Sequence, residues 1–139
     1  SKALIILVPD MVNLAHYINE VPVNLTDLLA NKNRPTTIIY QGAKNLATNL
    51  IAGDGSIAIR MPQHDFCQAL LQQWGKPLVS TSANISGEPT PSSFKEIKAI
   101  VKQQIDYCLP FSPFAKQAAQ APSRILLFKE NGEMLVIRA

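Results

Sequence analysis

The stretch SIAIRMPQHDFCQALLQQWGKPLVS, residues 56–80, contains a strand, a helix and a second strand in succession. Residues 56–60 are β-prone and apolar up to a terminal charge, and residues 65–74 carry apolar side chains at helical spacing. These apolar positions of the helix are Phe66, Ala69, Leu70 and Trp74. Gly75 suits a helix end, because a residue in the left-handed conformation commonly follows the last turn. Residues 77–80 predict a short buried strand, so the whole stretch is typical of an α/β fold.

The residues upstream continue this alternation. The continuous apolar run at residues 3–8 predicts a strand covered on both faces, and residues 36–40 predict another. Short helices are predicted after Asp10, which can cap one, and from Asn24, where Asp27 lies near the positive end of the helix dipole. A further short amphipathic helix is predicted from a group of apolar side chains, namely Leu46, Leu50 and Ile51.

The residues downstream end in a hairpin. Residues 93–104 open with Ser-Phe-Lys-Glu, which has the form of a capping box, and predict a helix. Residues 106–109 predict a strand. Residues 124–129 and 134–138 predict two strands joined across Asn131-Gly132, a pair that suits a type I′ turn. Because strands and helices alternate along the chain, the predicted class is α/β with a mixed sheet.

The composition is that of a globular protein. Hydrophobic residues make up 47% of the 139 residues and charged residues 17%, which excludes a disordered chain. No apolar run approaches the roughly 20 residues of a membrane helix, and no basic segment with a cleavage site opens the chain, so neither a membrane protein nor a secreted one is expected. Cys67 and Cys108 form no CxxC pair, which favours a reducing cytoplasm.

Net charge and histidine content say little about the class of ligand. The formal net charge of +3 is compatible with a phosphate-bearing or nucleic-acid ligand, but many proteins without such a partner carry a similar charge. His16 and His64 belong to no metal-ligand spacing, so no metal site is predicted.

A polar loop of small residues follows the strand at residues 77–80. Residues 81–84, Thr-Ser-Ala-Asn, offer hydroxyls, a carboxamide and backbone N–H groups at the carboxyl end of a strand, where open α/β sheets usually bind ligands. Small residues let a phosphate approach the backbone closely. The alternative is a turn whose Ser and Asn side chains satisfy the local backbone. The local chemistry leaves both interpretations open.

Two arginines at strand ends are candidate ligand contacts. Arg60 can clamp a carboxylate or a phosphate bidentately, or it can form a surface ion pair. The period of two in a strand places Ser56 and Ala58 on the same face as Arg60. Arg138 can face the same ligand or simply be solvated near the chain end.

A basic stripe is predicted on the helix at residues 93–104. Lys95, Lys98 and Lys102 are spaced at i, i+3 and i+7, so they would share one helix face. Such a stripe can contact an RNA backbone or be a solvated helix face.

Three segments resemble motifs of the YrdC-like threonylcarbamoyl-AMP synthase family. Residues 34–39, RPTTII, are similar to the family's Pro-x-x-x-Thr strand. Residues 54–62, DGSIAIRMP, resemble its DGSIAIRxP strand, and residues 77–90, PLVSTSANISGEPT, resemble its most recognisable signature. The order and spacing match, and the similarity extends from residue 2 to the chain end.

The resemblance implies a fold and a reaction. The family has a twisted mixed β-sheet with flanking helices and a basic concave face. It joins L-threonine, bicarbonate and ATP into threonylcarbamoyl-AMP and releases pyrophosphate, and Mg²⁺ bridging the phosphates is expected. A separate transferase complex then moves the threonylcarbamoyl group to tRNA. The threonine amine and bicarbonate supply the reacting atoms, so positioning and charge stabilisation would do most of the catalysis.

The resemblance also implies roles for individual residues. The expected threonine contacts are Arg60, Ser80 and Ser123. The expected ATP contacts are Ser56, Ser82, Asn84, Thr90 and Arg138. Two local differences concern the region of Ser123: the segment before Pro122 lacks the glycines that the family often has, and Arg124 replaces its usual Thr.

The family's N-terminal motifs, a Pro-Thr-x-Thr-x-Tyr-Gly turn and a Lys-x-Arg pair, have no counterpart in the sequence. Residues 1–139 are therefore expected to be one partial YrdC-like domain, truncated at its N-terminus. On its own it is expected to lack measurable synthase activity and, through an exposed sheet edge, to form a homodimer. The alternative functions are a tRNA or double-stranded RNA binding module without synthase activity, and a carbamoyl-transfer relative that acts on another substrate.

Overall fold

The computed structural model describes residues 4–31, 34–110 and 122–139. The chain separates into two compact units. Residues 4–80 and 122–139 form the first, here called the sheet unit, and residues 81–110 are the described part of the second, here called the loop unit.

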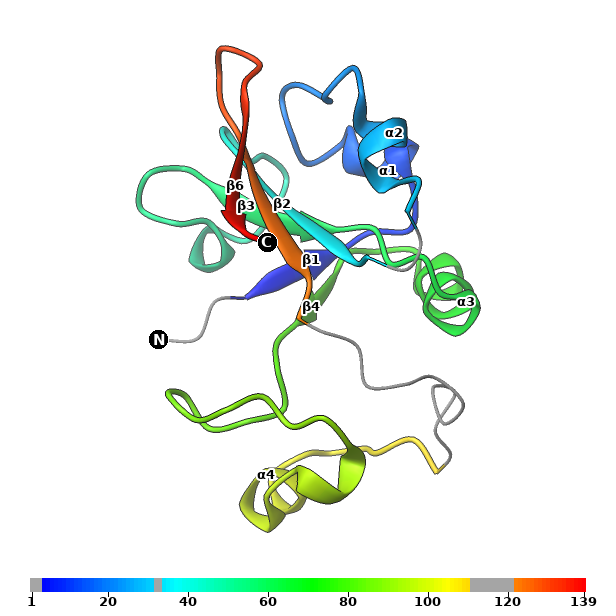
Figure 1. The fold of residues 1–139 in the computed structure, drawn as a ribbon. Coiled ribbons are helices and arrows are strands. Elements are labelled where there is room, and N and C mark those ends of the chain that lie inside the picture. Colours follow the sequence, from blue (N-terminus) through cyan, green and yellow to red (C-terminus); the bar gives the residue numbers. More distant parts are fainter. Residues whose placement is uncertain (1–3, 32–33, 111–121) are drawn as a thin grey trace. The chain divides into compact units, whose positions relative to one another are not determined.

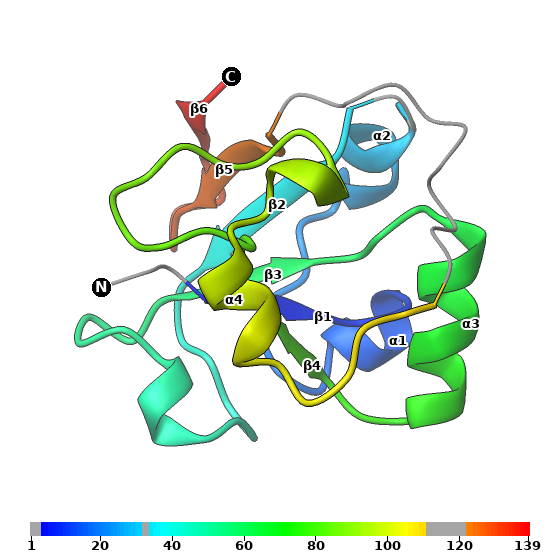
Figure 2. The same cartoon turned by 90° about the horizontal axis from the view of Figure 1, so that it is seen from below.

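The sheet unit contains a six-stranded sheet among its described residues, with the order β4-β1-β3-β2-β5-β6. This order can be followed from bottom to top in Figure 2. The strands are β1 (Ile5–Leu7), β2 (Thr36–Tyr40), β3 (Ile57–Arg60), β4 (Leu78–Ser80), β5 (Arg124–Phe128) and β6 (Met134–Arg138). β1 pairs with β3, and β2 with β5, in parallel, whereas the other three pairs are antiparallel. The predicted α/β class with a mixed sheet is confirmed.

Short helices connect the strands. They are α1 (Met11–Leu14), α2 (Leu25–Leu29), the 3₁₀ turn η1 (Thr48–Leu50) and α3 (Asp65–Trp74). α1 begins where the Asp10 carboxylate accepts a hydrogen bond from the Asn13 N–H at 2.8 Å. α3 ends as predicted at Gly75, which is left-handed. None of the helices in the described part of the chain is long and apolar enough to cross a membrane.

The core lies between the sheet and helices α1 and α2, which lie over one face of the sheet in Figure 1. In β3 the buried Ile57 and Ile59 point to this first face, and Ala58 and Arg60 alternate with them. The neighbouring strands and helices contribute buried side chains to the same cluster, among them Ile6, Leu14, Leu25, Ile38, Tyr40, Leu126 and Phe128. Burial of these apolar side chains is the main force that holds the unit together.

The alternating side chains of the strands form a second face. Paired residues point to the same side of a sheet, so the register places Arg60, Thr37, Ile125 and Arg138 on this face.

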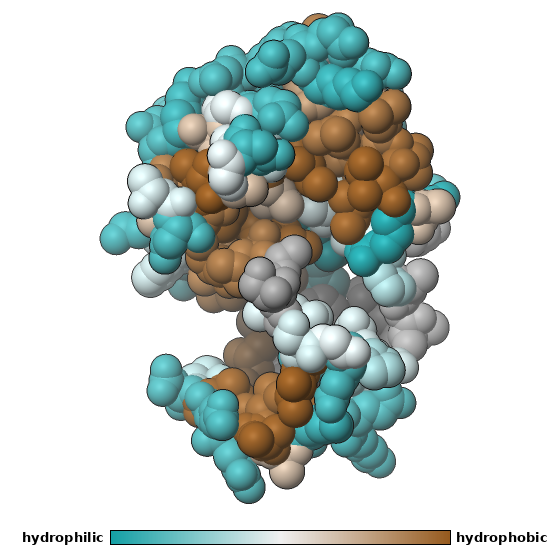
Figure 3. All heavy atoms as spheres, turned by 90° about the vertical axis from the view of Figure 1, so that its left-hand side faces the viewer, coloured by the Kyte–Doolittle hydropathy of each residue, from teal (hydrophilic) through white to brown (hydrophobic). Residues whose placement is uncertain are grey.

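Figure 3 shows hydrophobic side chains gathered over a broad area of the sheet unit, the upper body in that view. The edge strands β4 and β6 expose Val79 (47%) and Val136 (64%) among others. Self-association through such an edge stays a prediction.

Three expectations for burial in the sheet unit were wrong. In β1 only Ile6 is buried, and its two neighbours are half-buried, because the core covers one face of this strand. β4 is an edge strand rather than a buried one. α3 buries Leu71, which is 1% exposed, and leaves Leu70 and Trp74 46% and 53% exposed. Successive helical residues point about 100° apart, so turning Leu71 inward turns the predicted stripe outward.

Two local predictions in the sheet unit were also wrong. The helix expected around Leu46 is reduced to the three-residue η1. The hairpin loop is not type I′, which needs positive φ at both central residues. Among the described non-glycine residues only Asn45 has positive φ. Instead the Gly132 N–H donates to the Lys129 carbonyl at 3.0 Å, and φ of Gly132 is 85°. This is a type I turn followed by a left-handed glycine.

The loop unit forms little regular structure. The helix predicted over residues 93–104 is divided into η2 (Phe94–Glu96) and α4 (Ala99–Gln103), because Ile97 and Lys98 are extended. The predicted strand at residues 106–109 does not form. None of the residues described between 81 and 110 is buried. A helix here therefore has no packed face to stabilise it, and short helices are marginal without one.

Candidate functional site

Arg60 lies at the carboxyl end of β3 on the second face, beside Leu7 of β1. Its side chain is half-buried, and no ion pair joins it to a carboxylate of the described residues. Burial lowers the pKa of Arg60, an effect that the Cys67 thiol partly offsets. Because an arginine stays protonated in proteins, the result is a partly dehydrated cation. Of the two interpretations that the sequence left open, the surface ion pair has no support among these residues.

Thr37, Ser123 and Arg138 are joined by hydrogen bonds on the same face. The hydroxyls of Thr37 and Ser123 are 3.0 Å apart, and both residues are buried. The Arg138 guanidinium donates to the Ser123 carbonyl through Nε at 3.0 Å and through Nη2 at 2.6 Å. Nη2 also lies 3.4 Å from the Ser123 hydroxyl. The structure therefore brings together two predicted site residues and one, Thr37, that was not predicted.

Arg60 is adjacent to this group in the sheet. Ile38 pairs with Ile59 in the antiparallel β2–β3 ladder, so Thr37 lies opposite Arg60. Neighbouring strands are about 5 Å apart, so the side chains of Arg60 and Thr37 emerge side by side on the second face. A positive charge beside buried hydroxyls is suited to an anion with an attached polar group, such as an amino-acid carboxylate.

Ser56 and Ser80 lie farther toward the amino end of β3. Ser56 precedes β3 by one residue, and its N–H donates to Asp54 Oδ1 at 2.9 Å. Hydrogen bonds from Ser56 lower the pKa of Asp54. Ser80 pairs with Ile5 across the β1–β4 ladder, which places it on the second face but two strands from β3. Neither serine is therefore a sheet neighbour of Arg60.

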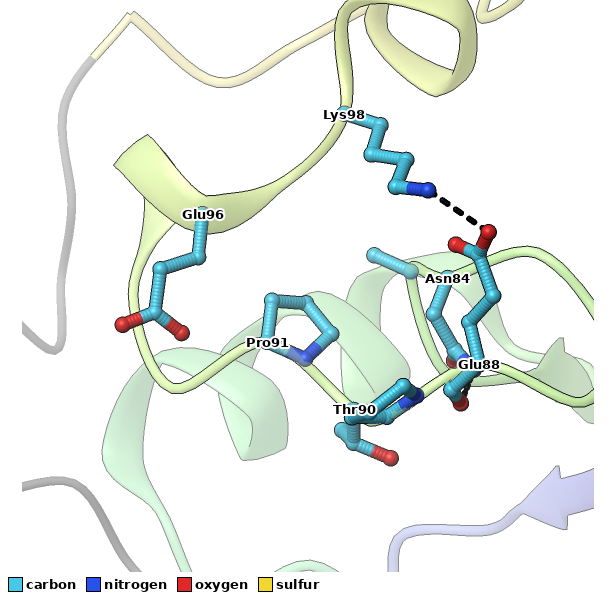
Figure 4. Close-up of a pocket in the computed structure, with 8 residues that line it drawn as sticks. Asn84, Glu88, Thr90, Pro91, Glu96 and Lys98 are labelled. Carbon is cyan, nitrogen blue, oxygen red and sulfur yellow. Dashed lines mark hydrogen bonds and ion pairs between the residues drawn. The ribbon is translucent and has the colours of Figure 1, made fainter.

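The loop unit contains a pocket of about 340 Å³, which Figure 4 shows. Asn84 and Thr90, both predicted ATP contacts, line it. The Asn84 amide donates to the carbonyls of Ile85 at 3.1 Å and Glu88 at 2.7 Å. These are the bonds that the turn interpretation predicts, and they stabilise the conformation of the loop. Ser82 belongs to the same loop and does not line the pocket.

The charges of the loop unit largely cancel. Lys98 points toward Glu88 in Figure 4 and forms an ion pair with it at 2.6 Å. Lys102 lies over the Phe94 ring at 4.4 Å, as in a cation–π contact. Its described residues contain three lysines and three carboxylates, namely Lys95, Lys98, Lys102, Glu88, Glu96 and Asp106. The three lysines do not share one helix face, so the predicted basic stripe is wrong.

Thr37 is the site residue that sequence reasoning missed. Two adjacent threonines in an otherwise apolar strand were the available signal, since adjacent residues point to opposite faces. Thr36 points to the first face, where its hydroxyl contacts the Arg34 carbonyl at 3.1 Å and Arg124 Nη2 at 3.1 Å. Only Thr37 can then face Ser123.

A metal site is not built by the described residues alone. No group of three or more His, Cys, Asp or Glu side chains among them is placed to hold an ion. Mg²⁺ is commonly bound through one or two carboxylates together with the phosphates of a substrate, and seldom by protein ligands alone.

Comparison with known proteins places the chain in a family. The model of the family of Sua5, YciO and YrdC, described as telomere recombination, matches residues 1–139. The chain belongs to this family. A threonylcarbamoyl-AMP synthase of Pseudoalteromonas translucida is 33% identical over 110 residues, which are 77% of this chain and 59% of that protein. A threonylcarbamoyl-AMP synthase of Serratia proteamaculans is 32% identical over 90% of this chain and 66% of its own length.

Solved structures agree with the family. E. coli YciO matches with a TM-score of 0.75 and 26% identity over 97% of this chain and 64% of YciO. P. abyssi Sua5 complexed with L-threonine matches with a TM-score of 0.66 and 22% identity, over 99% of this chain and 39% of Sua5. Full-length HypF, in a phosphate- and nucleotide-bound form, matches with a TM-score of 0.73 and 19% identity, over 99% of this chain and 21% of HypF. The last two likenesses show the fold alone. The family member described here thus spans about two thirds or less of these relatives.

Proposed function

We propose that this chain supplies the threonine-binding surface of a threonylcarbamoyl-AMP synthase, an enzyme that joins L-threonine, bicarbonate and ATP for the modification of tRNA. The observation that carries the proposal is Arg60, a half-buried guanidinium without an ion-pair partner among the described residues, opposite the hydroxyl of Thr37. Two further findings support it: the relatives named threonylcarbamoyl-AMP synthase, and a related fold, that of Sua5, which has been seen with L-threonine.

The chemistry assigned to the second face is recognition and orientation. Arg60 forks two N–H donors onto the threonine carboxylate, and Ser123 binds another polar atom of the amino acid. This arrangement holds the amine where it can attack bicarbonate, which loses water as the N–C bond of the carbamate forms. A carbamate oxygen then attacks the α-phosphorus of ATP, and pyrophosphate leaves as its bond to that phosphorus breaks. The reaction needs no nucleophile from the protein, so holding the reactants in line is the main contribution expected of these residues.

The nucleotide is assigned to the polar loop at residues 81–91. Thr90 and Asn84 line its pocket, and Ser82 lies in the same loop. A related fold, that of HypF, has been seen with phosphate and nucleotide. The pocket carboxylates Glu88 and Glu96 disfavour a bare triphosphate, so ATP is expected as its Mg²⁺ complex. Ser56 and Arg138, the other predicted nucleotide contacts, belong to the sheet unit. The product would pass to a transferase complex that acts on tRNA.

RNA binding without synthesis is the weaker alternative. It depended on a basic helix face, and the lysines concerned are divided between two short helices and an extended linker, with one of them paired to Glu88. A protein that follows a nucleic-acid backbone needs a concentration of positive charge. The synthase assignment does not need one.

The proposal is tested by replacing Arg60. Arg60→Ala is expected to weaken L-threonine binding by about 1.5–3 kcal/mol, the range for hydrogen bonds to charged groups. Isothermal titration with threonine, and separately with Mg-ATP, measures the two ligands apart. Arg34→Ala is the matched control, since Arg34 is an exposed arginine outside the second face. Unchanged threonine affinity in Arg60→Ala, or equal losses in both variants, would contradict the assignment.

A further inference from the structure

Ser123 is the only one of the predicted threonine contacts whose hydroxyl the described residues hold from two sides. Thr37 Oγ1 lies 3.0 Å from Ser123 Oγ, and Arg138 Nη2 lies 3.4 Å from it. Thr37 comes from β2, Arg138 from β6, and Ser123 immediately precedes β5 between them. The three residues are distant in sequence, so the sheet pairing itself creates this contact.

The number of protons on these side chains decides which hydrogen bonds Ser123 can still make. Arginine can only donate, so Ser123 Oγ is an acceptor toward Arg138. A hydroxyl has two acceptor sites and one proton. If Thr37 donates to the second acceptor site, the Ser123 proton is left to donate to a ligand on the second face. Thr37 is 1% exposed and Ser123 8%, so water competes weakly for these positions.

Arg138 is engaged mainly with the backbone of Ser123. Nε and Nη2 both donate to the same carbonyl, at 3.0 and 2.6 Å. A guanidinium has five N–H donors, and these bonds fix Ser123 while using only Nε and Nη2. The resemblance assigned Arg138 to ATP, and its contacts add a role toward threonine through Ser123.

We propose that Thr37 and Arg138 are positioning residues, which together orient the Ser123 hydroxyl for the amino-acid substrate. This rests on the proposed function, because the substrate in question is L-threonine. Arg138 acts on threonine through Ser123. Thr37 acts through its hydroxyl, so serine can replace it and valine, of nearly the same shape, cannot.

Thr36 provides a matched control for Thr37. Both are buried threonines of β2, at 5% and 1% exposure, and both use their hydroxyls in hydrogen bonds. They point to opposite faces of the sheet. Thr36→Val and Thr37→Val therefore each remove one buried hydroxyl from the same strand. Only Thr37→Val removes the hydroxyl that contacts Ser123. A general loss of stability affects both variants.

The experiment measures threonine affinity, Mg-ATP affinity and the χ1 rotamer of Ser123 by NMR coupling constants, all on the full chain. Thr37→Val is expected to lower threonine affinity about five- to tenfold and to average the Ser123 rotamer, while Mg-ATP affinity is unchanged. Thr37→Ser and Thr36→Val are expected to stay within about twofold of the wild type, since both keep the bond to Ser123. Arg138→Gln is expected to lower threonine affinity, because it removes donors that hold Ser123.

The opposite outcomes overturn the inference. A Thr37→Val chain that behaves as Thr36→Val does, with a single Ser123 rotamer, would show that the bond is merely structural. An Arg138→Gln chain that loses Mg-ATP affinity alone would return Arg138 to the nucleotide. Failure of the wild type to bind threonine at all would contradict the proposed function instead, and the Ser123 rotamer would still decide whether Thr37 and Arg138 position it.

Discussion

The two units hold their polar residues by different means. In the sheet unit, Thr37 and Ser123 are buried, 86 positions apart in sequence, and joined by strand pairing. In the loop unit, Asn84 bonds to the carbonyl of Glu88, four positions away, and no described residue is buried. The first arrangement depends on the whole fold, whereas the second depends on a turn. Sites on packed strands are more rigid than sites on loops, so the sheet unit is the part suited to select a small substrate.

The largest expected contrast is in core packing. Ile59, 2% exposed, belongs to the sheet-unit core, and Ile100 of the loop unit is 51% exposed. Ile59→Ala is expected to lower the free energy of unfolding by about 2–5 kcal/mol, because it removes buried methyl groups and leaves a cavity. Ile100→Ala is expected to change it by less than about 0.5 kcal/mol, as exposed substitutions usually do. Urea unfolding of both variants measures the two losses of stability. Similar losses would contradict the contrast in packing between the two units.

Helix capping gives a smaller contrast. Asp10 accepts the Asn13 N–H at 2.8 Å, whereas the Ser93 side chain, predicted to cap a helix, makes no such bond. Asp10→Ala is expected to lower the free energy of unfolding by about 1 kcal/mol. Ser93→Ala is expected to have almost no effect. Thermal unfolding at neutral pH compares them, and an equal loss in both would contradict the assigned caps.

The Asp10 cap also predicts a pH dependence. Hydrogen bonds from Asn13 lower the pKa of Asp10 below its ordinary value. The folded state therefore binds the proton more weakly than the unfolded state does. The stabilisation is present above the unfolded pKa of about 3.9 and is lost as the pH falls through the lower folded pKa. The stability difference between wild type and Asp10→Ala should shrink in acid, and a difference that is constant with pH would exclude the carboxylate as its source.

The smallest expected effect on stability is that of Asn84→Ala. Its bonds to Ile85 and Glu88 lie in a local turn at the surface, so the unfolding midpoint should change little. Mg-ATP affinity should fall if the loop holds the nucleotide. Titration with Mg-ATP and thermal unfolding of the same preparation separate the two. A sharply lowered midpoint with normal nucleotide affinity in the folded fraction would favour the turn interpretation.

Periodicity predicted the sheet well and burial less well. The alternation in Ile57-Ala58-Ile59-Arg60 placed β3 and the face of Arg60, because a strand has only two faces. The stripe of α3 was placed on the wrong side, since many apolar residues occur around that helix and only packing selects Leu71. The broken helix at residues 93–104 has the same cause. The Ser93 side chain makes no capping bond, and no core is present to hold the helix together.

The candidate site was predicted in its residues and not in its contacts. Family resemblance pointed to Arg60, Ser123 and Arg138, whereas the common face of the two arginines follows from the observed strand register. That Arg138 grips Ser123, and that Thr37 lies between Ser123 and Arg60, follow from the strand order β3-β2-β5-β6. Long-range strand order is decided by the fold as a whole, so local sequence could not supply it.

The most direct test of the central claim is a titration of the isotope-labelled chain with L-threonine, followed by NMR. We expect the largest shifts of backbone signals on the second face of the sheet, around Arg60, Thr37 and Ser123. The signal of the Arg60 side-chain Nε should shift with them. Arg60→Ala should abolish this response and Arg34→Ala should keep it. Shifts confined to residues 81–110, or a response that is unchanged in Arg60→Ala, would contradict the claim that the sheet unit binds threonine.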